Sequence, residues 1–218
     1  MAVTGLLLVL FVISHLAGNL LVYTGRDTLN DYAEFLKHNP LLVWTLRIGL
    51  LVVFVLHVLT SVRLSLANRA ARPERYVYMD TVQASAASRY MLLSGAMVFF
   101  YVIYHLLHFS AGIIDPDAFR MQQQMPDGHM RHDVFRMVVS GFQDDVVVAV
   151  YVVANLLLAW HLSHGIASLF QSLGVRSGRF TPMIERGGLW VSALIGAGFI
   201  SIPISIRFGL VKFTGGGG

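Results

Sequence analysis

The residues in this sequence most able to do chemistry are histidines that lie within long apolar segments. Six of the nine histidines do so: His15, His57, His105, His108, His161 and His164. Ionisable side chains are costly inside a lipid bilayer and usually serve a function there. One such histidine is as easily explained by a hydrogen bond to a neighbouring helix, but at least one in each of four consecutive segments indicates metal ligands. The remaining three, His38, His129 and His132, lie between segments, where a solvated side chain is expected.

Five apolar segments of about 20 residues are long enough to cross a membrane as helices. They are Val3–Tyr23, Leu41–Leu66, Tyr90–Ile114, Val146–Phe170 and Leu189–Leu210. The chain is 56% apolar and only 13% charged, whereas a soluble domain has about a quarter charged residues. We therefore expect an all-α integral membrane bundle of five transmembrane helices, whose first four carry the histidines. It forms a single domain over residues 1–218, with a disordered tail at 215–218.

Charges in the connections predict the orientation of this bundle. Arginine is concentrated in the second and fourth connections, at Arg69, Arg72, Arg75, Arg89, Arg176, Arg179 and Arg186. Positive charge marks the cytoplasmic side, so the N-terminus is expected inside and the C-terminus outside a bacterial-type cytoplasmic membrane. The net charge of +4 comes mainly from cations that flank apolar segments, which argues against nucleic-acid binding. The chain has no cysteine, so an iron–sulfur cluster or a thiolate-ligated haem requires a partner.

Depth along the helices sorts the histidines into two layers. His57 and His161 lie past the middle of their segments toward the cytoplasm, and His15 and His105 lie toward the outside. At the rise of an α-helix the layers are about 10–15 Å apart. This arrangement predicts two bis-histidine sites, each able to hold a b-type haem from both faces. Small residues one turn from the ligands leave room for a macrocycle or serve ordinary helix packing: Gly18, Ser61 and Gly165.

The other polar residues near these layers have more than one interpretation. His108 and His164 each follow a proposed ligand by three residues, so each could bond a haem propionate, a quinone or a neighbouring subunit, or be the ligand itself. The sequence favours His105 over His108 and His161 over His164. Candidate propionate partners on the inner side, which could equally be side chains at the membrane interface, are Arg63, Arg89 and Tyr90. Zinc or copper transport would require clustered carboxylates, which the segments lack.

Several short motifs resemble one protein family across essentially the whole chain. They are His15-Leu-Ala-Gly-Asn-Leu, Asp31-Tyr-Ala-Glu-Phe-Leu, Asn68-Arg-Ala-Ala-Arg-Pro, Ser88-Arg-Tyr, Tyr104-His-Leu-Leu-His-Phe, Trp160-His-Leu-Ser-His-Gly and Phe170-Gln-Ser-Leu-Gly. Together with the histidine spacing, they resemble the di-haem cytochrome b (b558-type) membrane anchor of succinate dehydrogenases and fumarate reductases. The fourth-segment motif and the spacing of the four histidines are the most specific parts.

The resemblance implies haem-iron axial ligands at His15, His57, His105 and His161. It implies two haem b groups, a quinone substrate, with menaquinone expected, and partners on the cytoplasmic face: a flavoprotein carrying FAD and an iron–sulfur subunit. Those partners would carry the succinate and fumarate chemistry, and this chain would pass electrons between the clusters and the quinone. Glu34 matches the family's acidic segment as a proton carrier for quinone, although a solvated loop carboxylate is the simpler interpretation. A higher oligomer of the complex is an open alternative.

Two other functions remain open from the sequence. One is a cytochrome b subunit of another quinone-linked complex, of the hydrogenase or formate dehydrogenase type, although the ligand spacing and the five-segment layout disfavour it. The other is a haem-free anchor or metal transporter. An absorption spectrum would identify a haem-free protein. The subunits that co-purify with the chain would identify a hydrogenase or formate dehydrogenase complex.

Overall fold

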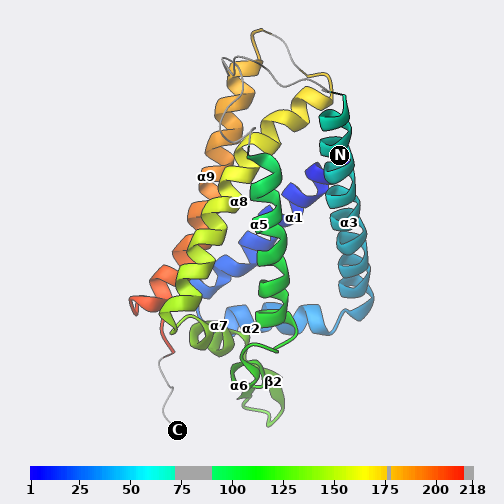
Figure 1. Cartoon of the computed structure of the whole chain (residues 1–218). Coiled ribbons are helices and arrows are strands. Elements are labelled where there is room, and N and C mark those ends of the chain that lie inside the picture. The colour runs from blue at the N-terminus through cyan, green and yellow to red at the C-terminus, as the bar shows by residue number, and fades with distance from the viewer. Residues whose placement is uncertain (72–89, 176–177, 214–218) are drawn as a thin grey trace.

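The five predicted membrane helices are present in a computed structural model, which describes residues 1–71, 90–175 and 178–213. Within these ranges, five helices are long and apolar enough to cross a membrane. They are α1 (Ala2–Leu20), α3 (Pro40–Ala70), α5 (Met91–His105), α8 (Asp145–Ser172) and α9 (Thr181–Arg207) (Figure 1). A 3₁₀ turn, η1 (Leu21–Thr24), continues α1, and a π-helical turn, η2 (Leu106–Ser110), continues α5. The all-α, five-helix prediction is thereby confirmed by length and composition.

Helix α8 occupies the centre of the bundle. It packs most extensively against α9 and also contacts α1 and α5. The α8–α9 contact is close, because a Cβ added at Gly196 would lie 2.7 Å from the Cβ of Ala159. Small residues allow this approach between membrane helices. Helix α1 crosses the bundle obliquely and contacts α3, α8 and α9 (Figure 1).

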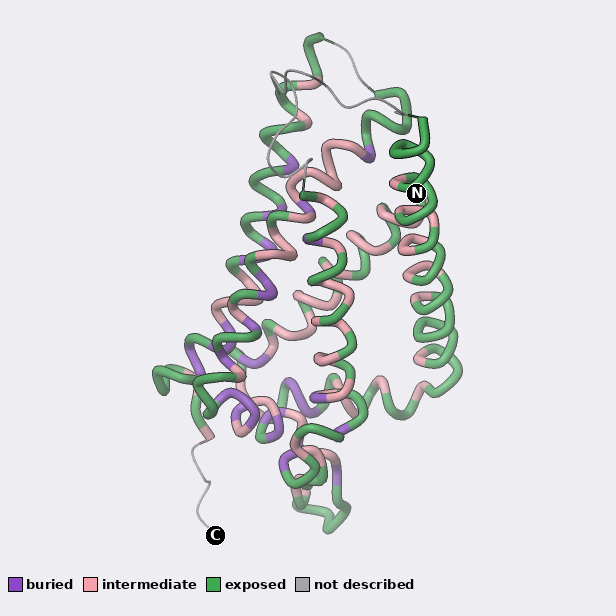
Figure 2. The backbone as a smooth tube through the Cα atoms, in the orientation of Figure 1, coloured by how far each residue is buried: buried purple, intermediate pink, exposed green. Residues whose placement is uncertain are grey.

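Helix α3 lies at the edge of the bundle. None of its residues is buried, and large apolar side chains such as Leu41, Trp44 and Leu51 are more than half exposed (Figure 2). In water such a surface would be unfavourable, but in a bilayer it faces lipid tails of the same polarity. Pro40 begins this helix, where its missing N–H removes no helical hydrogen bond.

The bundle carries a small polar layer at the end where α3 begins. It consists of α2 (Arg26–Lys37), α6 (Pro116–Phe119), an antiparallel hairpin of β1 (Gln122–Gln124) and β2 (Met130–His132), and α7 (Val134–Gly141). In the hairpin Gln123 lies opposite Arg131. Phe135 and Val139 of α7 pack with Leu29 of α2 in a buried cluster. The hairpin was not predicted from the sequence.

Some sequence-based predictions fall outside the described residues. These are the roles of Arg72, Arg75, Arg89 and Arg176 and the disorder of the 215–218 tail.

Candidate bis-histidine centres

His15 of α1 and His105 of α5 are brought together across the bundle. Their ring centroids lie 5.8 Å apart, with an angle of 83° between the ring planes. Two imidazoles that bind one metal ion from opposite sides, each at about 2 Å, have centroids about 6 Å apart. Phe11 stacks on His15 at 5.3 Å, so one face of this ring is covered by an apolar group. The spacing of this pair therefore fits a shared metal centre.

Tyr151 of α8 lies next to this pair, and its hydroxyl contacts both His105 and His108. Its hydroxyl is 3.3 Å from Nδ1 of His105 and 3.1 Å from Nδ1 of His108. A phenol hydroxyl has one hydrogen, so it donates to one ring and accepts from the other. If His105 binds metal through Nε2, its Nδ1 carries the hydrogen, and Tyr151 then donates to His108.

His108 has a different environment from His105. It is 3% exposed and stacks on Phe109, with centroids 4.0 Å apart. It belongs to η2, the π-helical turn that follows His105, and such turns change the direction of side chains relative to a regular α-helix. Of the two histidines, His105 makes a ring contact with His15, and His108 makes none among the described residues. The geometry favours His105 as the partner of His15.

His57 of α3 and His161 of α8 form the second group. The two rings lie close enough for their charges to interact, and His164 lies within the same range of His161. Nδ1 of His57 is 3.2 Å from the hydroxyl of Thr4 on α1. Nδ1 of His161 is 3.1 Å from the hydroxyl of Ser94 on α5. Each ring thus has one nitrogen hydrogen-bonded, and among the described residues the other nitrogen has no hydrogen-bond partner and could take a ligand.

A glycine follows each of these hydroxyl residues and lies beside the same ring. A Cβ added at Gly5 would meet Cε1 of His57 at 3.5 Å. A Cβ added at Gly95 would meet Cε1 of His161 at 3.2 Å, which is tighter than most real contacts. The pairs Thr4-Gly5 and Ser94-Gly95 were not identified from the sequence. Only the packing of helices distant in the chain distinguishes them from other small-residue pairs.

The small residues predicted from sequence make other contacts. A Cβ at Gly18 would lie 3.0 Å from the ring of Tyr32, so this side chain fills the adjacent space. Ser61 donates to the carbonyl of His57 at 2.6 Å, within its own helix. A Cβ at Gly165 would meet the methyl of Met91 at 3.6 Å. Of the proposed propionate partners, Tyr90 packs against Trp160 with centroids 6.2 Å apart and Arg63 is exposed on α3.

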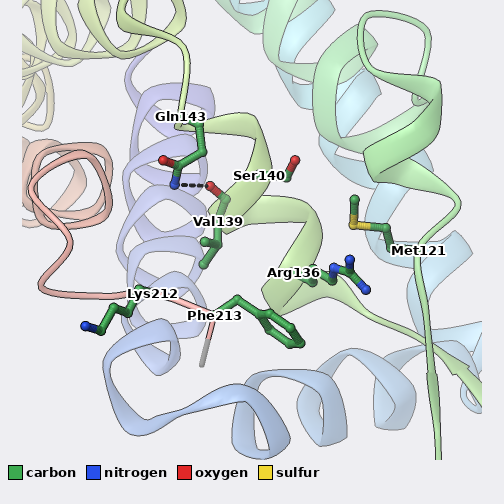
Figure 3. Close-up of a pocket in the computed structure, with 7 residues that line it drawn as sticks. All are labelled: Met121, Arg136, Val139, Ser140, Gln143, Lys212 and Phe213. Carbon is green, nitrogen blue, oxygen red and sulfur yellow. Dashed lines mark hydrogen bonds between the residues drawn. The ribbon is translucent and has the colours of Figure 1, made fainter. Parts of the chain in front are cut away.

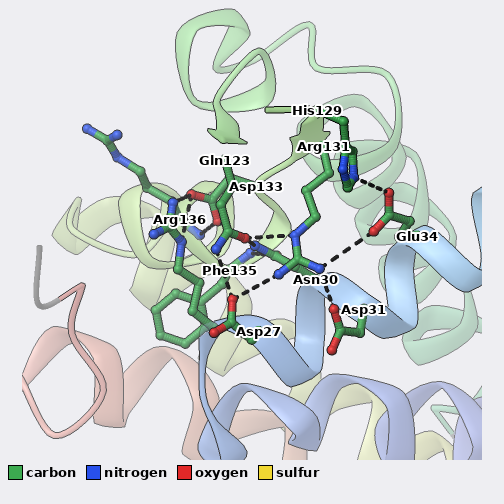
Figure 4. A network of polar contacts seen from close by, with 11 residues as sticks. Asp27, Asn30, Asp31, Glu34, Gln123, His129, Arg131, Asp133, Phe135 and Arg136 are labelled. Carbon is green, nitrogen blue, oxygen red and sulfur yellow. Dashed lines mark hydrogen bonds and ion pairs between the residues drawn. The ribbon is translucent and has the colours of Figure 1, made fainter. Parts of the chain in front are cut away.

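Glu34 lies in α2, where it takes part in an ion-pair network (Figure 4). Its carboxylate is 3.6 Å from Arg131 and 3.2 Å from Nε2 of His129, and its side chain is 25% exposed. Arg131 also pairs with Asp27 at 2.9 Å and with Asp31, although its own side chain is only 2% exposed. The simple expectation of a solvated loop carboxylate does not describe this residue. Glu34 also lines a hollow of about 180 Å³ together with Ala33, Lys37, Arg131 and His132.

His129 and His132, expected to be solvated, both have hydrogen-bond partners: His129 in the hairpin turn and in α2, and His132 in α6. His129 bonds Asp127 at 2.7 Å and Glu34 at 3.2 Å. The hydrogen bonds to Asp127 and Glu34 raise the pKa of His129 above its ordinary value. Nε2 of His132 lies 2.7 Å from the carbonyl oxygen of Phe119. His129 nonetheless remains solvated, as expected, with 47% of its side chain exposed, whereas His132 is only partly exposed.

Asp133, which lies next to this network, connects α2 to α7 through hydrogen bonds. Its side chain is 0% exposed and accepts bonds from Arg26 at 2.6 Å and from Asn30 at 2.9 Å. It also caps α7 by accepting from the N–H of Arg136 at 3.1 Å. Burial alone would raise the pKa of this carboxyl, but the bonds from Arg26, Asn30 and Arg136 together hold the pKa below its ordinary value.

A second hollow, of about 330 Å³, lies between α7 and the segment that follows α9 (Figure 3). Its lining consists of Met121, Arg136, Val139, Ser140, Gln143, Lys212 and Phe213. The guanidinium of Arg136 lies 5.0 Å from the centre of the Phe213 ring. None of the predicted site residues lines this hollow.

Comparison with known proteins adds no family to this geometry: no family model, curated protein or solved structure matches the chain. The functional argument therefore depends on the residues themselves. Within residues 1–71, 90–175 and 178–213, no group of three or more histidine, aspartate or glutamate side chains could hold a metal ion. Each histidine centre offers two protein ligands.

Proposed function

We propose that this chain is a di-haem cytochrome b that anchors a succinate:quinone oxidoreductase in the membrane. The observation that carries the proposal is the ring contact of His15 with His105, with centroids 5.8 Å apart, together with an electrostatic interaction between His57 and His161 on two further helices. The centres lie at different levels, because α1 reaches the His57 ring at Gly5 and contributes His15 ten residues later. Ten residues of α-helix rise about 15 Å. One chain would thus hold two redox groups in series across the bilayer.

Two protein ligands per centre support a porphyrin more than a bare metal ion. Protein zinc sites use three or four side-chain ligands, and the histidine centres have two. A porphyrin supplies four nitrogen ligands in its own plane and needs one imidazole from each face. Bis-histidine haem b transfers single electrons and leaves no axial position for oxygen. The residues of this chain would hold the group, orient it and keep water away from it.

The resemblance of the sequence motifs supplies the biological partners. A flavoprotein with FAD and an iron–sulfur subunit would dock on the arginine-rich, cytoplasmic end of the bundle, nearer to His57 and His161. Electrons would pass from that end toward His15 and His105, and from there to a membrane quinone, with menaquinone as the expected species. In fumarate reduction the direction reverses.

Quinone reduction needs a proton source near the electron-accepting end. Glu34 is proposed for this role because it lies at the end of the bundle where α5 terminates at His105 and faces the hollow of about 180 Å³. Arg131 and His129 lie beside its carboxylate, at 3.6 and 3.2 Å. Replacement by glutamine keeps the size and hydrogen bonding of the side chain and removes its ability to carry a proton.

Spectroscopy of the purified protein tests the proposal directly. We expect a reduced b-type α-band, two haems per chain and two redox transitions. Replacing His57 or His161 by alanine should remove one transition, and replacing His15 or His105 should remove the other. His38→Ala is the matched control, because this histidine is exposed and its ring, among the described residues, bonds only the carbonyl of Glu34 at 3.0 Å.

Either of two outcomes would overturn the proposal: absence of the α-band, or a haem-to-chain ratio near one. Loss of the His15-linked transition from His108→Ala, with His105→Ala harmless, would instead reassign the ligand. Identification of the co-purifying subunits separates a succinate:quinone oxidoreductase from a hydrogenase or formate dehydrogenase complex.

A further inference from the structure

The hydroxyl groups of Thr4 and Ser94 each lie within hydrogen-bond distance of a backbone carbonyl of their own helix. Thr4 donates to the carbonyl of Met1 at 2.8 Å. Ser94 donates to the carbonyl of Met91 at 3.1 Å. Each bond follows the common pattern in which a helical hydroxyl donates to a carbonyl three or four residues earlier. Neither hydroxyl has a second hydrogen for the histidine ring that it faces.

The tautomer of each ring follows from this arrangement. With that bond made, Thr4 accepts at its contact of 3.2 Å with Nδ1 of His57, and Ser94 accepts at its contact of 3.1 Å with Nδ1 of His161. In this arrangement both Nδ1 atoms carry the hydrogen. A neutral imidazole has one hydrogen between its two nitrogens, so Nε2 of each ring presents a free lone pair. Both rings are thereby fixed in the form that binds a metal through Nε2.

We infer that Thr4 and Ser94 are positioning residues that fix the tautomer and orientation of His57 and His161 and set the electron affinity of the group between them. The inference rests on the proposed function. Acceptors on the non-ligating nitrogen of a metal-bound histidine fix the ring and raise its basicity. A more basic imidazole stabilises the oxidised metal. The two hydroxyls thus favour the ferric state at this centre.

The neighbouring glycines belong to the same arrangement. Gly5 and Gly95 allow the backbone of α1 and α5 to approach the ring edges, with Cβ-to-Cε1 distances of 3.5 and 3.2 Å for an added methyl group. With a larger residue the hydroxyl and the ring would move apart. Each hydroxyl residue and the glycine that follows it therefore act together. One such pair lies on α1 and faces His57, and the other lies on α5 and faces His161.

The bundle also contains matched hydroxyls that lack the histidine contact. Thr60 lies three residues from His57 and donates within its own helix, to the carbonyl of Leu56 at 2.7 Å or to the backbone carbonyl of His57 at 3.1 Å. Ser163 lies two residues from His161 and donates to the carbonyl of Trp160 at 2.7 Å. Both make the same kind of helical bond as Thr4 and Ser94. They differ in the absence of a hydrogen bond to a ligand ring among the described residues.

The test is a potentiometric titration of the purified full-length protein in lipid nanodiscs, followed at the α-band, with low-temperature electron paramagnetic resonance of the oxidised state. In Thr4→Val and Ser94→Ala the transition lost in His57→Ala should move to higher potential, and the other transition should not move. The resonance signal of the same centre should broaden, because the rings gain rotational freedom. Thr60→Val and Ser163→Ala should match the wild type.

Rescue variants keep the test informative if a larger change disturbs folding. Thr4→Ser and Ser94→Thr retain the accepting oxygen and should restore the wild-type potential and signal. The inference is overturned if the potential is unchanged in Thr4→Val and Ser94→Ala. It is also overturned if the potential shifts as far in the rescue variants Thr4→Ser and Ser94→Thr as it does in Thr4→Val and Ser94→Ala. Wild-type protein without two haems would instead overturn the proposed function, so the two failures are distinguishable.

Discussion

Replacement of Tyr151 by phenylalanine isolates the hydroxyl that links His105 to His108. Tyr151 is 4% exposed and its ring packs against Phe142 with centroids 4.9 Å apart, so the aromatic packing is retained. Two hydrogen bonds are lost, which in membrane proteins corresponds to about 1 kcal/mol in total. The buried Nδ1 of His108 loses its partner, which costs about 1–3 kcal/mol more. We expect a total destabilisation of about 2–4 kcal/mol.

Tyr101→Phe is the matched control. The Tyr101 ring also packs against His105, with centroids 6.0 Å apart. Its hydroxyl accepts one long bond, 3.4 Å from the amide nitrogen of Asn155, and has no histidine partner among the described residues. We expect destabilisation below about 1 kcal/mol.

Unfolding of the two variants in nanodiscs, together with the redox titration, measures these differences. Tyr151→Phe should lower the unfolding midpoint clearly more than Tyr101→Phe. It should also shift the redox transition assigned to His15 and His105 and leave the other in place. Equal effects of the two substitutions on both measurements would refute the assignment of the shared hydroxyl.

Two further predictions concern pH and packing. The pKa of His129 is raised by Asp127 and Glu34, so its contribution to hairpin stability is full below about pH 6.5 and is lost as the pH rises through the raised value. Hydrogen exchange of residues 122–132 should therefore accelerate over that range in the wild type, and His129→Gln should abolish the dependence. In Gly95→Ala the new methyl would lie 3.2 Å from Cε1 of His161, a crowding that costs about 1–3 kcal/mol. Haem content should fall at that centre alone, and unchanged content would contradict the close approach.

The membrane helices could be predicted from the sequence because a long apolar run is a direct signal. The sequence segment Val146–Phe170 lies within α8, and Leu41–Leu66 lies within α3. The last helix begins at Thr181, well before the expected Leu189, because Thr181, Pro182 and the polar residues after them form its first turns. Apolarity predicts the membrane-crossing part of a helix better than its ends.

The polar layer at one end of the bundle was harder to predict. The strands Gln122–Gln124 and Met130–His132 have no alternating apolar pattern, so sequence periodicity cannot identify them. They are held by Arg131, a buried cation whose partners lie about 100 residues earlier in α2. Such long-range ion pairs depend on where two helices end in space, which local sequence does not specify.

The helix rise per residue indicated which histidines lie at the same depth in the bundle. It could not indicate which side chains hydrogen-bond to their rings. A depth argument uses only the position along one helix, whereas the contact between Thr4 and His57 joins residues 53 apart in the chain. It depends on the rotation and crossing angle of both helices. The hydroxyl residues were therefore visible in the sequence but had no predicted role.

The two candidate centres differ in which hydroxyl group accepts the hydrogen bond from Nδ1 of the histidine. His57 and His161 each face a hydroxyl of their own, which accepts from Nδ1 when its hydrogen is donated within the helix. His105 shares the hydroxyl of Tyr151 with His108, so its tautomer depends on the direction in which Tyr151 donates. His105 can bind metal through Nε2 only if His108 accepts from Tyr151. In that arrangement His108 is a buried acceptor, a role not predicted from the sequence, and it keeps Tyr151 oriented as His105 requires.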